Sequence, residues 1–153
     1  MSKYSEADMK QRAFKRVALV LRERYEETRE EFKIEGTARV HTRIFEILIP
    51  DVYVSYGESV KLNGVARGSR REHIVPCKYI RDYAFRMYAS NCLEIEVEKM
   101  IERLLKIAYI TSDEARQVDE KYKDNMPDGW VDDETKSSIT ARLDEFGINL
   151  KKY

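Results

Sequence analysis

The sequence has few of the residues that interrupt a chain or cross-link it. Among 153 residues there are six glycines, three prolines and two cysteines. Such low glycine and proline contents exclude collagen-like and low-complexity chains. Two cysteines, Cys77 and Cys92, are too few for the disulfide framework of a small secreted protein. We therefore expect both to be free thiols.

Long apolar runs are also missing. No segment approaches the roughly 20 apolar residues that a membrane-spanning helix needs, so we expect no membrane association. The first residues, MSKYSEADMKQR, do not contain the apolar stretch of a secretory signal. We therefore expect a cytoplasmic protein. A chain of this length is enough for one hydrophobic core, which predicts a single domain over residues 1–153.

The sequence has no net charge, because 28 Lys and Arg balance 28 Asp and Glu. This balance argues against a protein that covers nucleic acid with its whole surface. The charges are nevertheless segregated. Residues 61–81 hold six basic and one acidic side chain, whereas residues 94–134 hold six basic and thirteen acidic ones. A basic segment in an otherwise acidic chain favours binding of a polyanion at one place. Internal pairing of these arginines with acidic helices is the alternative.

Residues 5–35 predict a long N-terminal helix. They contain strong helix formers, no glycine or proline, and apolar residues at roughly helical spacing. The second half, from residue 22, carries four basic and six acidic side chains and two aromatic ones. One interpretation is a surface helix with ion pairs along its length. The other is an arm that contacts a second subunit, which would make the protein a homodimer.

The segment before the centre of the chain is ambiguous. Residues 37–62 contain β-branched and aromatic residues in short runs, which predicts two or three short strands or a mixed connector. A buried helix over residues 40–49 fits equally well, because apolar residues fall on both faces under either assumption. Residues 63–76 predict a loop that runs into a short strand.

The remaining sequence predicts helices around one more strand. Apolar spacing indicates a helix over residues 78–105, with Asn91 as a point where it breaks or kinks. A short apolar strand over residues 106–110 then leads to a helix that starts after Thr111 with acidic residues in its first turn. Residues 124–153 predict a loop and a short helix. We therefore expect an α+β protein that is mainly helical.

One short stretch combines the residue types of hydrolytic chemistry. Glu72 and His73 stand together in a predicted strand that Pro76 ends. A carboxylate can hold a divalent cation that stabilises the leaving oxygen of a phosphodiester, and an imidazole can take a proton from the attacking water. Arginines nearby would hold the phosphate.

The residues Glu72-His73-Ile74-Val75-Pro76 resemble the first strand of the HNH, or His-Me finger, endonucleases, which read D/E-H-I/V-x-P there. Residues 106–115 resemble the second half of that motif, an apolar strand that leads into a T-x-E-E-H helix start. The resemblance covers residues 67–117, with the predicted helix 78–105 as an insertion. It implies a small ββα core around one metal ion, of the type found in phages and other mobile elements.

The resemblance implies a metal-dependent endonuclease with His73 as general base and Glu72 as a ligand to Mg²⁺ or Mn²⁺. The sequence departs from the family at Lys106, where the family has asparagine, and at Ala115, where it has the metal-binding histidine. Asp113, Glu114 and Asp119 are the candidate replacement ligands. The residues expected to hold nucleic-acid phosphates are Arg67, Arg70, Arg71 and Lys78.

Because of these departures, a non-catalytic protein with a degenerate nuclease fold is the alternative. Such a protein would bind DNA or a host protein without cutting. Zinc is not expected, because the two cysteines do not form a CxxC pair and a fourth ligand to accompany them and His73 is not evident.

Overall fold

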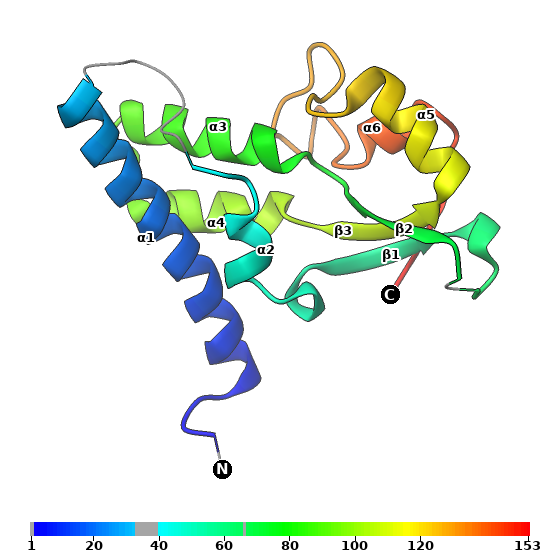
Figure 1. Cartoon of the computed structure of the whole chain (residues 1–153), viewed down its shortest axis with the longest axis horizontal. Coiled ribbons are helices and arrows are strands. Elements are labelled where there is room, and N and C mark those ends of the chain that lie inside the picture. The colour runs from blue at the N-terminus through cyan, green and yellow to red at the C-terminus, as the bar shows by residue number, and fades with distance from the viewer. Residues whose placement is uncertain (1, 33–39, 66) are drawn as a thin grey trace. The chain divides into compact units, whose positions relative to one another are not determined.

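The computed structural model describes residues 2–32, 40–65 and 67–153, and it confirms an α+β fold with a long N-terminal helix (Figure 1). The chain divides into two compact units. The first unit comprises residues 1–53 and 80–103, and the second comprises residues 54–79 and 104–153. Each unit is therefore built from two separate stretches of the chain.

Helix α1 (Glu6–Phe32) confirms the predicted N-terminal helix, although the predicted residues 33–35 lie outside the described ones. The helix begins after Ser5 because that side chain accepts a hydrogen bond from the Asp8 N–H (3.1 Å), while the Asp8 carboxylate accepts one from the Ser5 N–H (3.1 Å). Phe14 and Leu21 are fully buried, so the first half of α1 contributes to the core of the first unit.

The second half of α1 both packs and forms ion pairs within the first unit. The Tyr25 ring stacks on two aromatic rings of α3 (Cys77–Ala89), those of Phe85 and Tyr88, with centroid distances of 6.3 and 6.2 Å. Arg22 pairs with Glu94 at 3.0 Å. These contacts agree with the interpretation of a surface helix with ion pairs. A homodimer through this helix stays a prediction.

Residues 40–62 form a mixed connector, one of the structures predicted for the segment 37–62. Residues 37–39 lie outside the described ones. A short helix occupies part of residues 40–49, where the sequence allows a buried helix, and one strand follows. The elements are α2 (Ile44–Leu48), the 3-10 helix η1 (Asp51–Tyr53), β1 (Ser55–Ser59) and the 3-10 helix η2 (Val60–Leu62).

The predicted break at Asn91 is confirmed. The helix expected over residues 78–105 is present as two helices, α3 and α4 (Glu94–Leu104). Asn91 lies between them with φ of 60°, in the left-handed region that a regular helix cannot contain.

The second unit contains a four-stranded sheet with the order β2-β3-β1-β4. Strand β3 (Ile107–Thr111) is antiparallel to β2 (Ser69–His73) and parallel to β1, and β4 (Leu150–Lys152) is antiparallel to β1. Helices α5 (Ser112–Tyr122) and α6 (Ala141–Asp144) lie on the same side of this sheet (Figure 1). In chain order, β2 is followed by α3, α4, β3 and α5, so two helices stand between strands that pair with each other in the sheet.

The two faces of the sheet differ in what they pack against. Ala108 and Ile110 form a buried cluster with α5 and α6 residues, including Val118 and Leu143. We call this side of the sheet the helix face. Tyr109 lies between Ala108 and Ile110 in β3, so strand alternation places it on the other side, which we call the open face.

Strand β4 was not predicted, although the short helix expected in residues 124–153 is present as α6. Gly57 in β1 makes the pairing with β4 possible. A Cβ atom at this position would lie 2.5 Å from the backbone oxygen of Lys151, closer than a real side chain comes. The close approach of two backbones therefore requires glycine at position 57.

Candidate nucleic-acid interface

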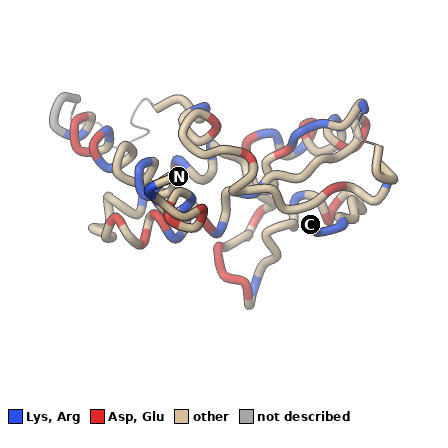
Figure 2. Tube along the Cα trace, turned by 90° about the horizontal axis from the view of Figure 1, so that it is seen from below, with Lys and Arg blue, Asp and Glu red and all other residues tan. Residues whose placement is uncertain are grey.

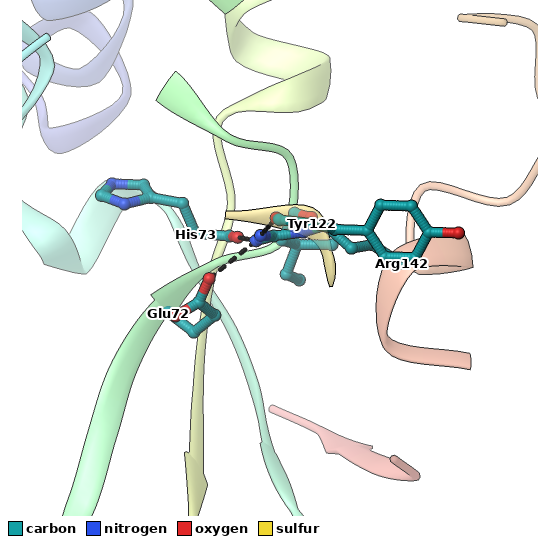
Figure 3. Close-up of polar contacts among 5 residues, drawn as sticks. Glu72, His73, Tyr122 and Arg142 are labelled. Carbon is teal, nitrogen blue, oxygen red and sulfur yellow. Dashed lines mark hydrogen bonds and ion pairs between the residues drawn. The ribbon is translucent and has the colours of Figure 1, made fainter. Parts of the chain in front are cut away.

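Strand β2 separates the two residues predicted to share a catalytic site. Glu72 pairs in register with Ala108 of the helix face, whereas His73 pairs with Ile107 and belongs to the open face. Figure 3 shows the His73 ring pointing away from the Glu72 carboxylate. Because neighbours in a strand point to opposite sides, the two side chains do not converge on one substrate position.

The Glu72 carboxylate is engaged by a buried arginine from α6. Arg142 is fully buried and donates a hydrogen bond to Glu72 Oε1 at 2.7 Å. Its guanidinium also donates to backbone oxygens of Tyr122 (2.6 Å), Ile74 (3.4 Å) and His73. Figure 3 shows this arrangement, in which one side chain joins the end of β2 to the end of α5.

Burial controls the titration of Glu72. Desolvation raises its pKa above the ordinary value, the Arg142 guanidinium opposes this shift, and the charge of Asp119 adds to it. The carboxylate thus balances a buried positive charge. Because Oε1 accepts from Arg142, a metal ion bound by the other carboxylate oxygen would lie beside the buried guanidinium charge, which would repel it.

Glu114 has a structural role at the start of α5. The Thr111 Oγ1 accepts a hydrogen bond from the Glu114 N–H (3.1 Å), and Glu114 Oε1 accepts one from the Thr111 N–H (2.9 Å). This capping box confirms the predicted helix start. The other carboxylate oxygen, Oε2, accepts from the Ser59 hydroxyl at 2.9 Å. Asp113 is exposed and pairs with Arg116.

The residues predicted to bind a metal ion are not brought together. Among residues 2–32, 40–65 and 67–153, no group of three or more His, Cys, Asp or Glu side chains is placed to hold a metal ion. Glu72 is bound to Arg142, Glu114 is buried in the capping box, and Asp113 is on the surface. The residues present therefore do not fit the Mg²⁺ or Mn²⁺ site that the sequence resemblance implies. Cys77 and Cys92 are free thiols.

The basic residues of the predicted phosphate site lie largely on the surface. Arg67, Arg70 and Lys78 are exposed, and Arg71 is half-buried. Neither Arg67 nor Arg70 forms an ion pair with another described residue. Internal pairing, the alternative for the basic segment, applies to Arg81, which pairs with its neighbour Asp82 at 2.9 Å.

The loop before β2 is tied to the start of α5. The Ser112 hydroxyl donates a hydrogen bond to the backbone oxygen of Gly68 at 3.0 Å. This bond holds the loop that carries Arg67 against the N-terminus of the helix. The acidic residues Asp132, Asp133 and Glu134 belong to a different loop, between α5 and α6, where Figure 2 shows them as a red stretch.

The open face presents one residue from each strand in a single row. The β2–β3 register pairs Arg71 with Tyr109, the β3–β1 register pairs Tyr109 with Glu58, and the β1–β4 register pairs Glu58 with Lys151. Tyr153 follows β4 and is 67% exposed. Of these residues, only Arg71 was predicted from the sequence. The other pairings depend on strand order, which a single sequence does not reveal.

Comparisons with protein families, curated proteins and solved structures found no match to this chain. Within the described residues, no helix combines the length and apolar character that crossing a bilayer requires.

Proposed function

We propose that this protein binds nucleic acid through the second unit and does not cut it. The observation that carries the proposal is the surface position of Arg67 and Arg70, which form no ion pair with described residues, in a segment with a net charge of +5 over residues 61–81. Exposed arginines without carboxylate partners bind phosphate oxygens by charge-assisted hydrogen bonds.

The non-catalytic function is favoured over an endonuclease by the positions of the proposed catalytic groups. Glu72 and His73 lie on opposite faces of the sheet, and Glu72 is held by Arg142. Strands β2 and β3 pair with each other and α5 follows β3, which supports a nuclease-like fold in which these groups serve structure. Nucleic acid is therefore proposed as a ligand, with DNA the first to test.

Binding is tested with the double variant Arg67→Ala/Arg70→Ala and a fluorescent DNA fragment at several salt concentrations. We expect roughly tenfold weaker binding, and a slope of log affinity against log salt that is smaller by about two, because two phosphate contacts are lost. The matched control is Lys123→Ala/Lys136→Ala, which removes two exposed cations from the acidic part of the same unit. Equal affinities for the two double variants would contradict the proposal.

The absence of cutting is tested separately with supercoiled plasmid in Mg²⁺ or Mn²⁺. We expect the wild type and His73→Ala to leave the plasmid equally intact. Nicking by the wild type that is lost in His73→Ala would instead establish the endonuclease and reject the non-catalytic function.

A further inference from the structure

The row on the open face has the dimensions of a short piece of nucleic acid. Neighbouring strands lie about 4.8 Å apart, so the row of Arg71, Tyr109, Glu58 and Lys151 spans roughly 14 Å across four strands. Stacked nucleotides are about 3.4 Å apart, which places a few of them along this row. Ile107, the next open-face residue of β3, is fully buried, whereas Ser55, which pairs with it in β1, is exposed.

Two tyrosines provide surfaces on which bases can stack. Tyr109 is half-buried in the central part of the sheet, and Tyr153 extends the face beyond β4 with 67% of its surface exposed. Desolvation raises the pKa of Tyr153, and the charges of Glu58 and Tyr109 raise it further. Aromatic rings on an exposed sheet face stack on unpaired bases regardless of sequence.

The charges of the row suit a single strand better than a duplex. Lys151 stands exposed at one end of the row, where it would attract a phosphate, and Arg71 stands half-buried at the other end. Glu58 stands between Tyr109 and Lys151 and would repel a phosphate at that point. A carboxylate accepts hydrogen bonds from the exocyclic amino groups of bases. In a single strand these amino groups are not engaged in base pairs, so they are free to bind Glu58.

We propose that the open face binds single-stranded nucleic acid, with Tyr109 and Tyr153 stacked on bases and Glu58 accepting a hydrogen bond from a base amino group. This inference rests on the proposed nucleic-acid binding and names a single-stranded ligand and a second contact surface, since Arg70 pairs with Ile110 of the helix face. It predicts two preferences. One is for single strands over duplexes, and the other is for cytosine over uracil, because uracil has a carbonyl oxygen where cytosine has an amino group.

The experiment measures fluorescence anisotropy of labelled strands about 12 nucleotides long, a typical site size for one domain. The probes are oligo-dC, oligo-dU, oligo-rC and a mixed-sequence duplex. We expect oligo-dC or oligo-rC to bind at least about tenfold more tightly than the duplex. Tighter binding of the duplex by the wild type would overturn the single-strand proposal while the proposed function stands. Absence of binding to every probe would reject both.

Substitutions separate stacking from a structural role. Tyr153→Leu and Tyr109→Leu are each expected to weaken oligo-dC binding by about tenfold, whereas Tyr153→Phe and Tyr109→Phe retain the ring and the affinity. Tyr153→Leu keeps the test decisive if Tyr109→Leu fails to fold, because Tyr153 is exposed. The control is Tyr4→Leu, a partly exposed tyrosine of the first unit that precedes α1. Unchanged binding by Tyr153→Leu would overturn the proposal.

The proposed role of Glu58 is tested by the preference for oligo-dC over oligo-dU. In Glu58→Gln the carboxylate is replaced by an amide that both donates and accepts, so the preference for oligo-dC over oligo-dU is expected to shrink by roughly tenfold. General affinity is expected to rise slightly, since a negative charge is removed. A preference that is unchanged in Glu58→Gln would overturn the assignment of Glu58 to base recognition.

Discussion

The two faces of the sheet in the second unit use charged residues in different ways. On the helix face, Glu72 and Glu114 are held by named partners, and Arg142 is fully buried. On the open face, Glu58 and Lys151 lie in a row that extends across all four strands. These carboxylates of the helix face therefore stabilise the fold, whereas Glu58 and Lys151 belong to the surface that we propose binds a ligand.

This difference shows why sequence proximity misleads for Glu72 and His73. In a strand, neighbouring side chains belong to opposite faces, so two adjacent polar residues enter different environments. The partner that decides the role of Glu72 is 70 residues away, in α6. A motif of adjacent residues becomes a site only if the strand ends or bends between them, and β2 includes both residues.

The largest expected effect comes from breaking the buried pair of the helix face. Arg142→Ala removes the counter-charge of Glu72 and three further hydrogen-bond connections to backbone oxygens. We expect the free energy of unfolding to fall by about 3–5 kcal/mol, because the Glu72 carboxylate is left buried without its partner. Urea denaturation followed by circular dichroism measures the change.

The control for this change is Arg116→Ala. Arg116 also pairs with a carboxylate, but the pair with Asp113 is on the surface, where ion pairs contribute about 0–1 kcal/mol. Similar losses for Arg142→Ala and Arg116→Ala would show that the buried pair does not stabilise the helix face as described.

An intermediate effect is expected at the start of α5. Glu114→Ala removes one half of the capping box and leaves the buried Ser59 hydroxyl without its acceptor. We expect a loss of about 1–2 kcal/mol. Asp113→Ala, at the adjacent and exposed position, is expected to cost less than about 1 kcal/mol. Thermal denaturation of the two variants distinguishes them, and a larger loss for Asp113→Ala would contradict the assignment.

The smallest expected effect is a pH dependence from Glu72. Its pKa in the folded protein is above the ordinary value of 4.5, so the folded state binds this proton more tightly than the unfolded state does. The stability that Glu72 contributes is thus fully present below pH 4.5 and is lost as the pH rises through the folded pKa. The free energy of unfolding of the wild type, relative to Glu72→Gln, is expected to decrease over that window.

Denaturation of both proteins at a series of pH values measures this dependence. An increase in the stability of the wild type relative to Glu72→Gln as the pH rises above 4.5 would mean that the pairing with Arg142 outweighs desolvation.

Local sequence signals predicted local structure well. The long helix, the break at Asn91 and the capped start of α5 all depend on residues within a few positions of one another. Strand β4 was missed because its three residues include two lysines and lack the apolar alternation of a strand. Its pairing depends on Gly57, which lies more than 90 residues earlier.

The candidate site was predicted in part for the same reason. Arg67 and Arg70 were expected on a basic segment, and their exposure follows from local polarity. The engagement of Glu72 by Arg142 and the row that includes Tyr109 and Lys151 depend on strand order and helix packing. No periodicity in one sequence encodes those contacts, so Glu72 was assigned to a metal from its residue type and from the sequence resemblance.

The strand order determines whether fragments of this protein can form the sheet on their own. Strands β1 and β2 precede residues 80–103, and β3 and β4 follow them, yet the order in the sheet is β2-β3-β1-β4. Each hydrogen-bonded strand pair therefore joins a strand that precedes residues 80–103 to a strand that follows them. Neither half can build any part of the sheet alone, and a chain cut within residues 80–103 would regain its sheet only through reassociation of the two fragments.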